Sequence, residues 1–116
     1  MTRKRAEVLT GYEIRTLARP SGRFQLGAFV EDQLIAEATH WTEHLALKAL
    51  VEAVYRLHCG KVLKQCGGRC VRCRLQSAHH IHHKRYRSHG GTHEVDNLEP
   101  VCWDCHRMIH EIEYSQ

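Results

Sequence analysis

Two C-x-x-C pairs in the second half of this 116-residue chain constrain its fold more than any other feature. The pairs are Cys70–Cys73 and Cys102–Cys105. Each short spacing puts two thiolates on one tight turn, and two such turns complete a tetrahedral zinc site. Aromatic residues make up only 7% of the chain, so the core of so small a protein needs a staple. The sequence therefore predicts a structural Zn²⁺ ion held by these four cysteines.

A disulfide inside a C-x-x-C pair is the alternative staple, and it is typical of a redox site. Neither pair has a thioredoxin-like strand and helix around it, so zinc is preferred. The basic N-terminus leads into no apolar signal core, and no run of about 18 apolar residues follows. We therefore expect a reducing, intracellular compartment, the cytoplasm. The remaining cysteines, Cys59 and Cys66, are expected to be a buried thiol and a loop thiol.

Charge is distributed unevenly along the chain, whose formal net charge is +4. Acidic residues stop at Glu52 and resume at Glu94. The basic residues between them are Arg56, Lys61, Lys64, Arg69, Arg72, Arg74, Lys84, Arg85 and Arg87. Such a stretch attracts a polyanion, and a nucleic-acid backbone is the commonest one. A solvated basic face without a partner is the alternative.

Residues 1–60 are expected to form a small ββ(β)α lobe of unknown role, after a flexible basic lead over residues 1–10. Alternation predicts strands at 12–17, 24–30 and 34–38, with turns at 20–22 and 31–33. From residue 42 to residue 58 the period becomes helical, and Gly60 is expected to end the helix. The apolar stripe expected to pack this helix on the meander is Leu47, Leu50, Val51, Val54 and Leu57.

Residues 61–116 are expected to form a second module, with a hinge at Gly67–Gly68. Its motifs follow in the order C-x-x-C, a histidine cluster, Gly90–Gly91, Asn97–Leu98 and C-x-x-C-H. This order resembles the HNH endonuclease family, the ββα-metal nucleases, over about residues 66–113. The resemblance implies an α+β protein in which a zinc-stabilised ββα-metal (HNH/His-Me finger) module follows the N-terminal lobe. It also implies metal-dependent hydrolysis of DNA phosphodiester bonds.

The family's intervals indicate which clustered histidine is the general base. Its members place the base 14 positions before the Asn, and the Gly pair seven and eight positions after the base; His83 meets both conditions. The resemblance therefore assigns His83 as the base and Asn97 as the residue that fixes the loop and orients it. His82 takes the position that is often Asp and that is histidine in colicin-type nucleases. His79–His80 remains the alternative pair.

A catalytic metal site is expected beside the base. Neighbours on a strand face opposite ways, so His82 can face a metal while His83 faces the attacking water. His106 and His110 are four residues apart, on one face of a helix starting near Cys102. We expect His82, His106 and His110 to hold one divalent ion, Mg²⁺, Mn²⁺, Ni²⁺ or Zn²⁺. A Cys₂His₂ finger tail and a solvated His110 are the alternatives.

The basic side chains near these motifs are expected to contact DNA phosphates: Lys84, Arg85, Arg87, Arg72 and Arg74. We expect His79, His80, His89 and His93 at the surface or on phosphate, and Trp103 in the core between the cysteine turns. The predicted function is a metal-dependent HNH endonuclease acting on DNA, double-stranded by default. The alternative is a catalytically inactive, zinc-stabilised nucleic-acid-binding module.

Overall fold

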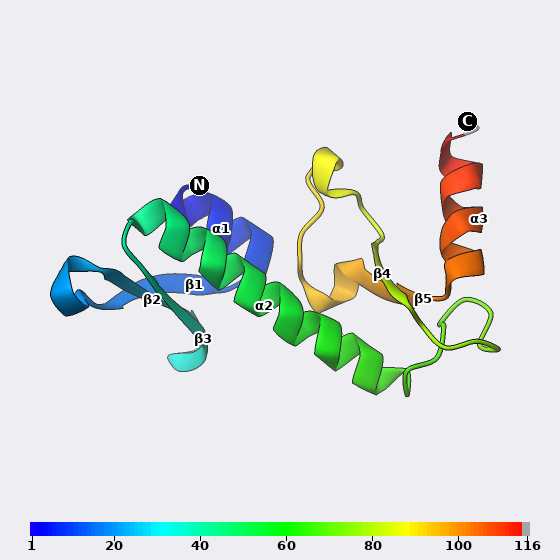
Figure 1. Cartoon of the computed structure of the whole chain (residues 1–116), viewed down its shortest axis with the longest axis horizontal. Helices are drawn as coiled ribbons and strands as arrows, with labels where there is room; N and C mark the ends of the chain where they lie inside the picture. Colours follow the sequence, from blue (N-terminus) through cyan, green and yellow to red (C-terminus); the bar gives the residue numbers. More distant parts are fainter. Residues whose placement is uncertain (115–116) are drawn as a thin grey trace. The chain divides into compact units, whose positions relative to one another are not determined.

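The computed structural model describes the backbone of residues 1–114 and the side chains of residues 1–112. The chain divides into two compact units (Figure 1). Unit 1 comprises Met1–Leu57 together with Thr92–Glu94, and unit 2 comprises His58–Gly91 and the residues from Val95 onward. Helices and strands occur together, which confirms the predicted α+β class.

Eleven elements follow one another along the described chain. Unit 1 contains α1 (Arg3–Thr10), β1 (Glu13–Ala18), the 3-10 turn η1 (Pro20–Gly22), β2 (Phe24–Val30) and β3 (Gln33–His40). Helix α2 (Glu43–Gln65) begins in unit 1 and ends in unit 2. Unit 2 then contains β4 (His80–His83), the 3-10 turns η2 (Arg87–His89) and η3 (Val95–Asn97), β5 (Leu98–Val101) and α3 (Trp103–Tyr114). Within the described residues, no helix combines the length and the apolar character that a membrane span requires.

The three strands of unit 1 form the expected antiparallel meander, in the order β1-β2-β3. Ile14 pairs with Ala28, which pairs in turn with Ala36, so one face of the sheet carries apolar side chains. That face and the helices enclose the core of unit 1. Its buried residues are Ala6, Leu9, Ile14, Leu26, Ala28, Ala46, Leu47, Leu50, Val51 and Val54. The stripe predicted for the helix is therefore buried except at Leu57, the last residue of unit 1, which is 50% exposed.

The expectation of a flexible lead over residues 1–10 is wrong, because these residues form α1. The Thr2 side chain caps the N-terminus of the helix, and Gly11, with a φ of 79°, closes its C-terminus. Ala6 and Leu9 are buried in the core of unit 1. Packing of Ala6 and Leu9 in the core stabilises so short a helix more than these local caps do.

Helix α2 also runs further than its sequence predicts. It was expected to end at Gly60, but it continues to Gln65. A glycine inside a helix costs only about 1 kcal/mol relative to alanine, which the packing of a 23-residue helix readily offsets. The helix ends where Gly67 and Gly68 adopt φ values of 63° and 76°. The Gly68 amide there donates to a carbonyl of the last helical turn at 2.9 Å.

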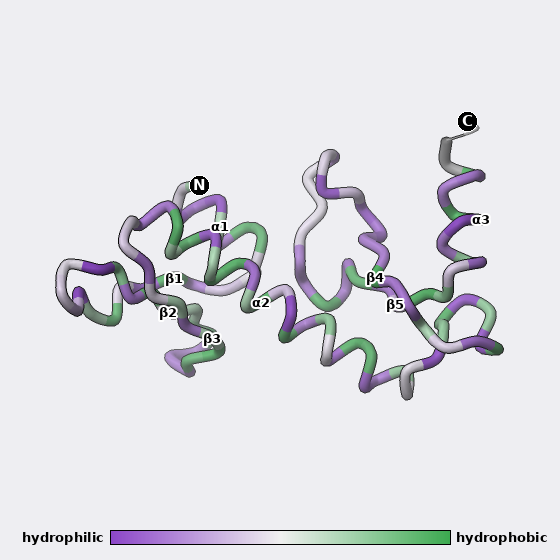
Figure 2. The backbone as a smooth tube through the Cα atoms, viewed as in Figure 1, coloured by the Kyte–Doolittle hydropathy of each residue, from purple (hydrophilic) through white to green (hydrophobic). Residues whose placement is uncertain are grey.

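Unit 2 contains the ββα arrangement that the family resemblance implies. Strands β4 and β5 pair antiparallel, with His82 opposite Glu99, and α3 follows directly. The buried cluster of the unit is small and contains Cys70, Val101, Cys102 and Ile109. Hydrophobic positions alternate with hydrophilic ones along α3 (Figure 2), and the helix contributes Ile109 to that cluster, with Cys105 packed against it. So small an apolar cluster fits the expectation that a metal stabilises this module.

Candidate metal centre and catalytic cleft

The four cysteines of the two C-x-x-C pairs meet in unit 2. The sulfur atoms of Cys70, Cys73, Cys102 and Cys105 all lie within 4.8 Å of one another, and none forms a disulfide. The Sγ atoms of Cys73 and Cys102 are 3.9 Å apart. Tetrahedral zinc with Zn–S bonds of about 2.3 Å separates its sulfurs by about 3.8 Å, so the group is suited to this ion.

Local hydrogen bonds favour the thiolate form of Cys70, one of the four cysteines. Burial raises the pKa of the Cys70 thiol, but backbone N–H groups of Cys73, Cys102 and Arg72 outweigh it and lower this pKa to about 6. A lowered pKa favours the thiolate, which is the form that binds metal. The turn between Cys70 and Cys73 supplies two of these amides, those of Arg72 and Cys73, and Cys102 of the second pair supplies the third.

Three histidines form a second potential metal-binding group, from β4 and α3. The ring nitrogens of His82, His106 and His110 lie within 4.8 Å of one another. His106 and His110 share one face of α3, and their Nε2 atoms are 2.9 Å apart, at hydrogen-bond distance. His82 is only 4% exposed. Three imidazoles on two rigid elements are a donor set suited to a divalent transition-metal ion.

The neutral form of one of these rings, His106, is favoured. Burial, followed by the neighbouring His80, His110 and His82 rings, lowers the pKa of His106. The neutral ring is the form that offers a lone pair to a metal.

His83 adjoins this group in a cleft of about 280 Å³. The lining includes His82, His83, Tyr86, Arg87, His106 and His110. Burial, and then the charges of Arg87 and His82, lower the pKa of His83. The ring is therefore neutral at neutral pH, as a proton acceptor requires.

Asn97 clamps the loop that follows His83. Its side-chain Nδ2 donates to the Arg85 carbonyl at 3.1 Å, and its Oδ1 accepts from the Arg85 amide at 2.8 Å. The Asn97 carbonyl also accepts from the Lys84 amide at 2.9 Å. Three hydrogen bonds thus hold the two residues that come directly after His83.

The glycine pair makes this loop compact. The Gly91 amide donates to the Tyr86 carbonyl at 2.8 Å. A Cβ atom at Gly91 would lie 1.8 Å from the Arg85 carbonyl oxygen, so no larger residue fits this backbone path. The requirement for glycine therefore comes from a close backbone approach.

The net charge of the chain resides in unit 2. This unit holds nine of the 17 basic residues and five of the 13 acidic ones, whereas unit 1 holds eight of each. Lys84, Arg85, Arg87 and Arg74 are exposed. Arg72 is also exposed, but its Nε donates to the Glu99 carboxylate at 2.6 Å, which compensates much of its charge. The Arg85 guanidinium donates to the His89 carbonyl at 2.7 Å.

The other clustered histidines have different surroundings. His79 is exposed and lies outside the three-histidine group. His80 is partly buried, and its ring stacks on that of His106 at 4.3 Å. Because His80 and His82 are two residues apart on a strand, they share the face turned toward α3. This alternation along the strand is a sequence signal for the contact between His80 and α3.

Two expectations about individual side chains are wrong. His93 was expected at the surface or on phosphate, but it is buried in unit 1 and only 2% exposed. Its ring centroid lies 4.7 Å from that of Tyr55, and its backbone amide donates a hydrogen bond to the Leu9 carbonyl. Trp103 was expected in the core, but it is 58% exposed at the start of α3, where its ring lies 3.7 Å from that of His80. The two remaining cysteines are both half-buried: Cys59 lies within α2 and Cys66 just after its end.

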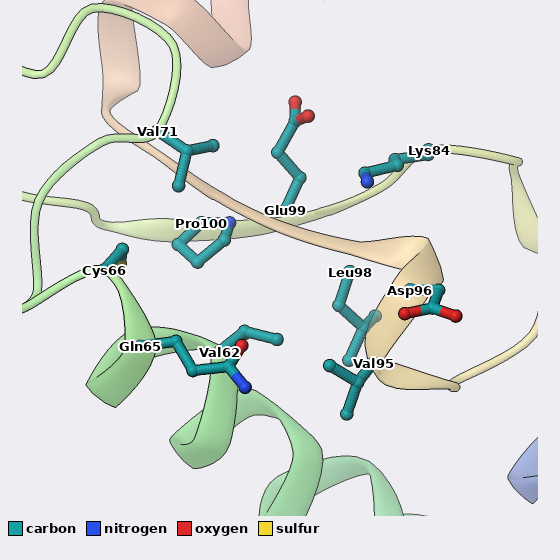
Figure 3. Close-up of a pocket in the computed structure, with 10 residues that line it drawn as sticks. All are labelled: Val62, Gln65, Cys66, Val71, Lys84, Val95, Asp96, Leu98, Glu99 and Pro100. Carbon is teal, nitrogen blue, oxygen red and sulfur yellow. The ribbon is translucent and has the colours of Figure 1, made fainter.

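Another cleft in unit 2, of about 520 Å³, has a different character (Figure 3). Apolar side chains from α2 and β5 line it, including Val62, Leu98 and Pro100, with Lys84, Asp96 and Glu99 among its polar residues. It contains no histidine. Of these two clefts, only the smaller one is lined by histidines.

Comparison with known proteins agrees with this arrangement. Residues 65–111 match the family model of the HNH endonuclease. Neither the curated proteins nor the solved structures gave a match to the chain. The matched segment includes the four cysteines, His82, His83, Asn97, His106 and His110, whereas most of unit 1 lies outside it. Over residues 65–111, the chain therefore carries a domain of the HNH endonuclease family.

Proposed function

We propose that this protein is a metal-dependent endonuclease that hydrolyses phosphodiester bonds of DNA, with double-stranded DNA as its substrate. The observation that carries the proposal is the cluster of three imidazoles, from His82, His106 and His110, in one cleft with His83. The family match over residues 65–111 supports a nucleic-acid substrate. The net positive charge of unit 2 also supports it.

In this proposal His82, His106 and His110 hold one divalent ion, which is Mg²⁺, Mn²⁺, Ni²⁺ or Zn²⁺. When bound, such an ion supplies positive charge that polarises the scissile phosphate and stabilises the leaving oxygen. Cys70, Cys73, Cys102 and Cys105 hold a separate Zn²⁺ that keeps the hairpin and α3 together. These four closely spaced thiols suit a reducing compartment such as the cytoplasm.

His83 is the proposed general base. Its neutral ring accepts a proton from a water molecule whose oxygen attacks phosphorus, and the phosphorus–oxygen bond to the leaving sugar then breaks. Asn97 is a positioning residue, because its bonds to the Arg85 backbone hold the loop directly after His83. Lys84, Arg85, Arg87, Arg72 and Arg74 are proposed to contact neighbouring phosphates, with Arg72 contributing least because Glu99 pairs with it.

Nicking of supercoiled plasmid tests the proposal. The purified protein is incubated with plasmid and Mg²⁺, Mn²⁺, Ni²⁺ or Zn²⁺, beside His83→Ala and, as a matched control, His44→Ala. His44 is an exposed histidine of unit 1, so its removal should leave nicking unchanged. We expect the parent and His44→Ala to nick the plasmid, and His83→Ala to lose at least about a hundredfold in rate. A parent protein that shifts DNA in a gel but cuts it with none of these ions would be a binding module instead.

A second pair of variants tests which histidine is the base. His80→Ala removes a ring that stacks on His106 and does not line the cleft. We therefore expect His80→Ala to retain far more activity than His83→Ala. The reverse order would assign the chemistry to the His79–His80 pair.

A further inference from the structure

Two buried side-chain polar atoms have no hydrogen-bond partner among the described residues, and both belong to residues that pack on the three-histidine group. They are Nε2 of His80 and the hydroxyl oxygen of Tyr86. The Tyr86 ring lies nearly parallel to that of His110, with centroids 6.1 Å apart, and nearly perpendicular to that of His82 at 5.7 Å. Of the two residues, only Tyr86 lines the cleft that contains His83.

A buried hydroxyl without a partner is unfavourable, and native proteins nearly always satisfy such a group. The structure nevertheless holds Tyr86 firmly in place. Its carbonyl accepts from the His89 amide at 2.9 Å and from the Gly91 amide at 2.8 Å, while its ring packs on His110. The hydroxyl is thus presented by a rigid loop, as a group that binds a ligand must be.

The lining of the cleft indicates what the missing partner is. A neutral tyrosine hydroxyl can donate a hydrogen bond, and the other polar lining groups are histidines, Arg87 and Ser88. No carboxylate is present among the lining residues, so a negatively charged ligand meets no repulsion there. An anionic phosphate oxygen is therefore the acceptor that this site fits best.

We propose that the Tyr86 hydroxyl donates a hydrogen bond to an oxygen of the DNA phosphate bound in this cleft. The proposal rests on the proposed function, since it places the substrate phosphate beside His83. It makes Tyr86 a substrate-binding residue. No motif in the sequence marked Tyr86 for this role; only its contacts in the folded structure do.

Tyr86→Phe is the decisive variant, because it removes the hydroxyl and keeps the ring that packs on His110. Since the hydroxyl has no partner in the free protein, we expect the thermal midpoint to stay unchanged or to rise. Affinity for DNA should nevertheless fall about tenfold, because a charge-assisted hydrogen bond is lost. Opposite effects on stability and on affinity distinguish a ligand-binding hydroxyl from one that supports the fold.

The affinity is measured by fluorescence anisotropy with a labelled duplex oligonucleotide and Mg²⁺. The variants are made in the His83→Ala background, so that the DNA is not cut. Tyr55→Phe, a tyrosine of unit 1, is the matched control and should bind like its parent. Rates of plasmid nicking by Tyr86→Phe with an intact His83 should fall by a similar factor.

Each outcome decides the matter. Affinity equal to that of the parent would overturn the proposal, and so would a loss of affinity accompanied by a lower thermal midpoint. If the parent binds DNA but never cuts it, the endonuclease function fails, and the anisotropy comparison still decides whether Tyr86 contacts the phosphate. If the parent nicks DNA and Tyr86→Phe binds normally, only the role of Tyr86 is wrong.

Discussion

Replacing Gly91 with alanine should disrupt the loop between His83 and Asn97. The added Cβ would lie 1.8 Å from the Arg85 carbonyl oxygen and 2.8 Å from that of Tyr86. Even the shortest separation that real Cβ atoms show, 3.0 Å, requires a shift of 1.2 Å. Both obstructing atoms belong to the backbone, so no side-chain rotation relieves the contact.

The cost follows from the hydrogen bonds that such a shift would break. The Gly91 amide bond to Tyr86 is 2.8 Å long, and the two bonds that Asn97 makes with the Arg85 backbone are 2.8 and 3.1 Å. Lengthening each by more than 1 Å breaks all three. At about 1 kcal/mol for each bond, Gly91→Ala should destabilise unit 2 by about 3 kcal/mol and should greatly reduce nicking.

Urea unfolding measures this effect, and Gly60→Ala is the matched control. Gly60 lies inside α2 with nothing within 4 Å of a Cβ placed there, so alanine should stabilise the protein by about 0.5–1 kcal/mol. In a Trp41→Phe background the only tryptophan is Trp103 of α3, whose fluorescence reports on unit 2. A Gly91→Ala protein with unchanged unfolding and nicking would refute the reasoning.

Three further predictions concern metal, loop and charge. The double variant in which serine replaces both Cys70 and Cys73 should lose the bound zinc, and its unit 2 should unfold. Zinc binding contributes about 10 kcal/mol or more to the folding of such modules. A folded double variant in which metal analysis finds a full zinc equivalent would refute the four-cysteine site. Asn97→Asp lacks the amide donor to the Arg85 carbonyl, so its nicking rate and its thermal midpoint should both fall. An unchanged thermal midpoint in calorimetry would argue against the clamp. Arg74→Ala should reduce the magnitude of the slope of log affinity against log salt concentration by about 1. Arg72→Ala should reduce it less, because Glu99 already pairs with Arg72. Equal slopes for the two variants in anisotropy titrations would show that this pairing is irrelevant to DNA binding.

Much of the candidate site was predictable from the sequence because its groups depend on local spacing. Two cysteines separated by two residues share a turn, and two histidines separated by three share a helical face, whatever the rest of the chain does. The four-cysteine group and the grouping of His82 with His106 and His110 followed from such intervals and from the family resemblance. The meander was predictable because alternation and turn residues are also local signals.

Other features could not be predicted, because they depend on contacts between distant segments. Burial of Ala6 and Leu9 turns the first ten residues into a helix, and packing in both units carries α2 past Gly60. His93 is buried because its segment returns to unit 1. The clamp by Asn97 links residues twelve apart through side-chain atoms that no periodicity describes.

The sequence by itself determined which side chains are available for metal binding and for proton transfer, since their identities and intervals are properties of the covalent chain. Only the tertiary structure decided which of them share a cleft and which polar atoms lack a partner there. Tyr86 illustrates the difference, because its hydroxyl became notable only once the fold had buried it beside His82 and His110. Ligand spacing is local, whereas burial and hydrogen-bond satisfaction depend on every segment that packs around a group.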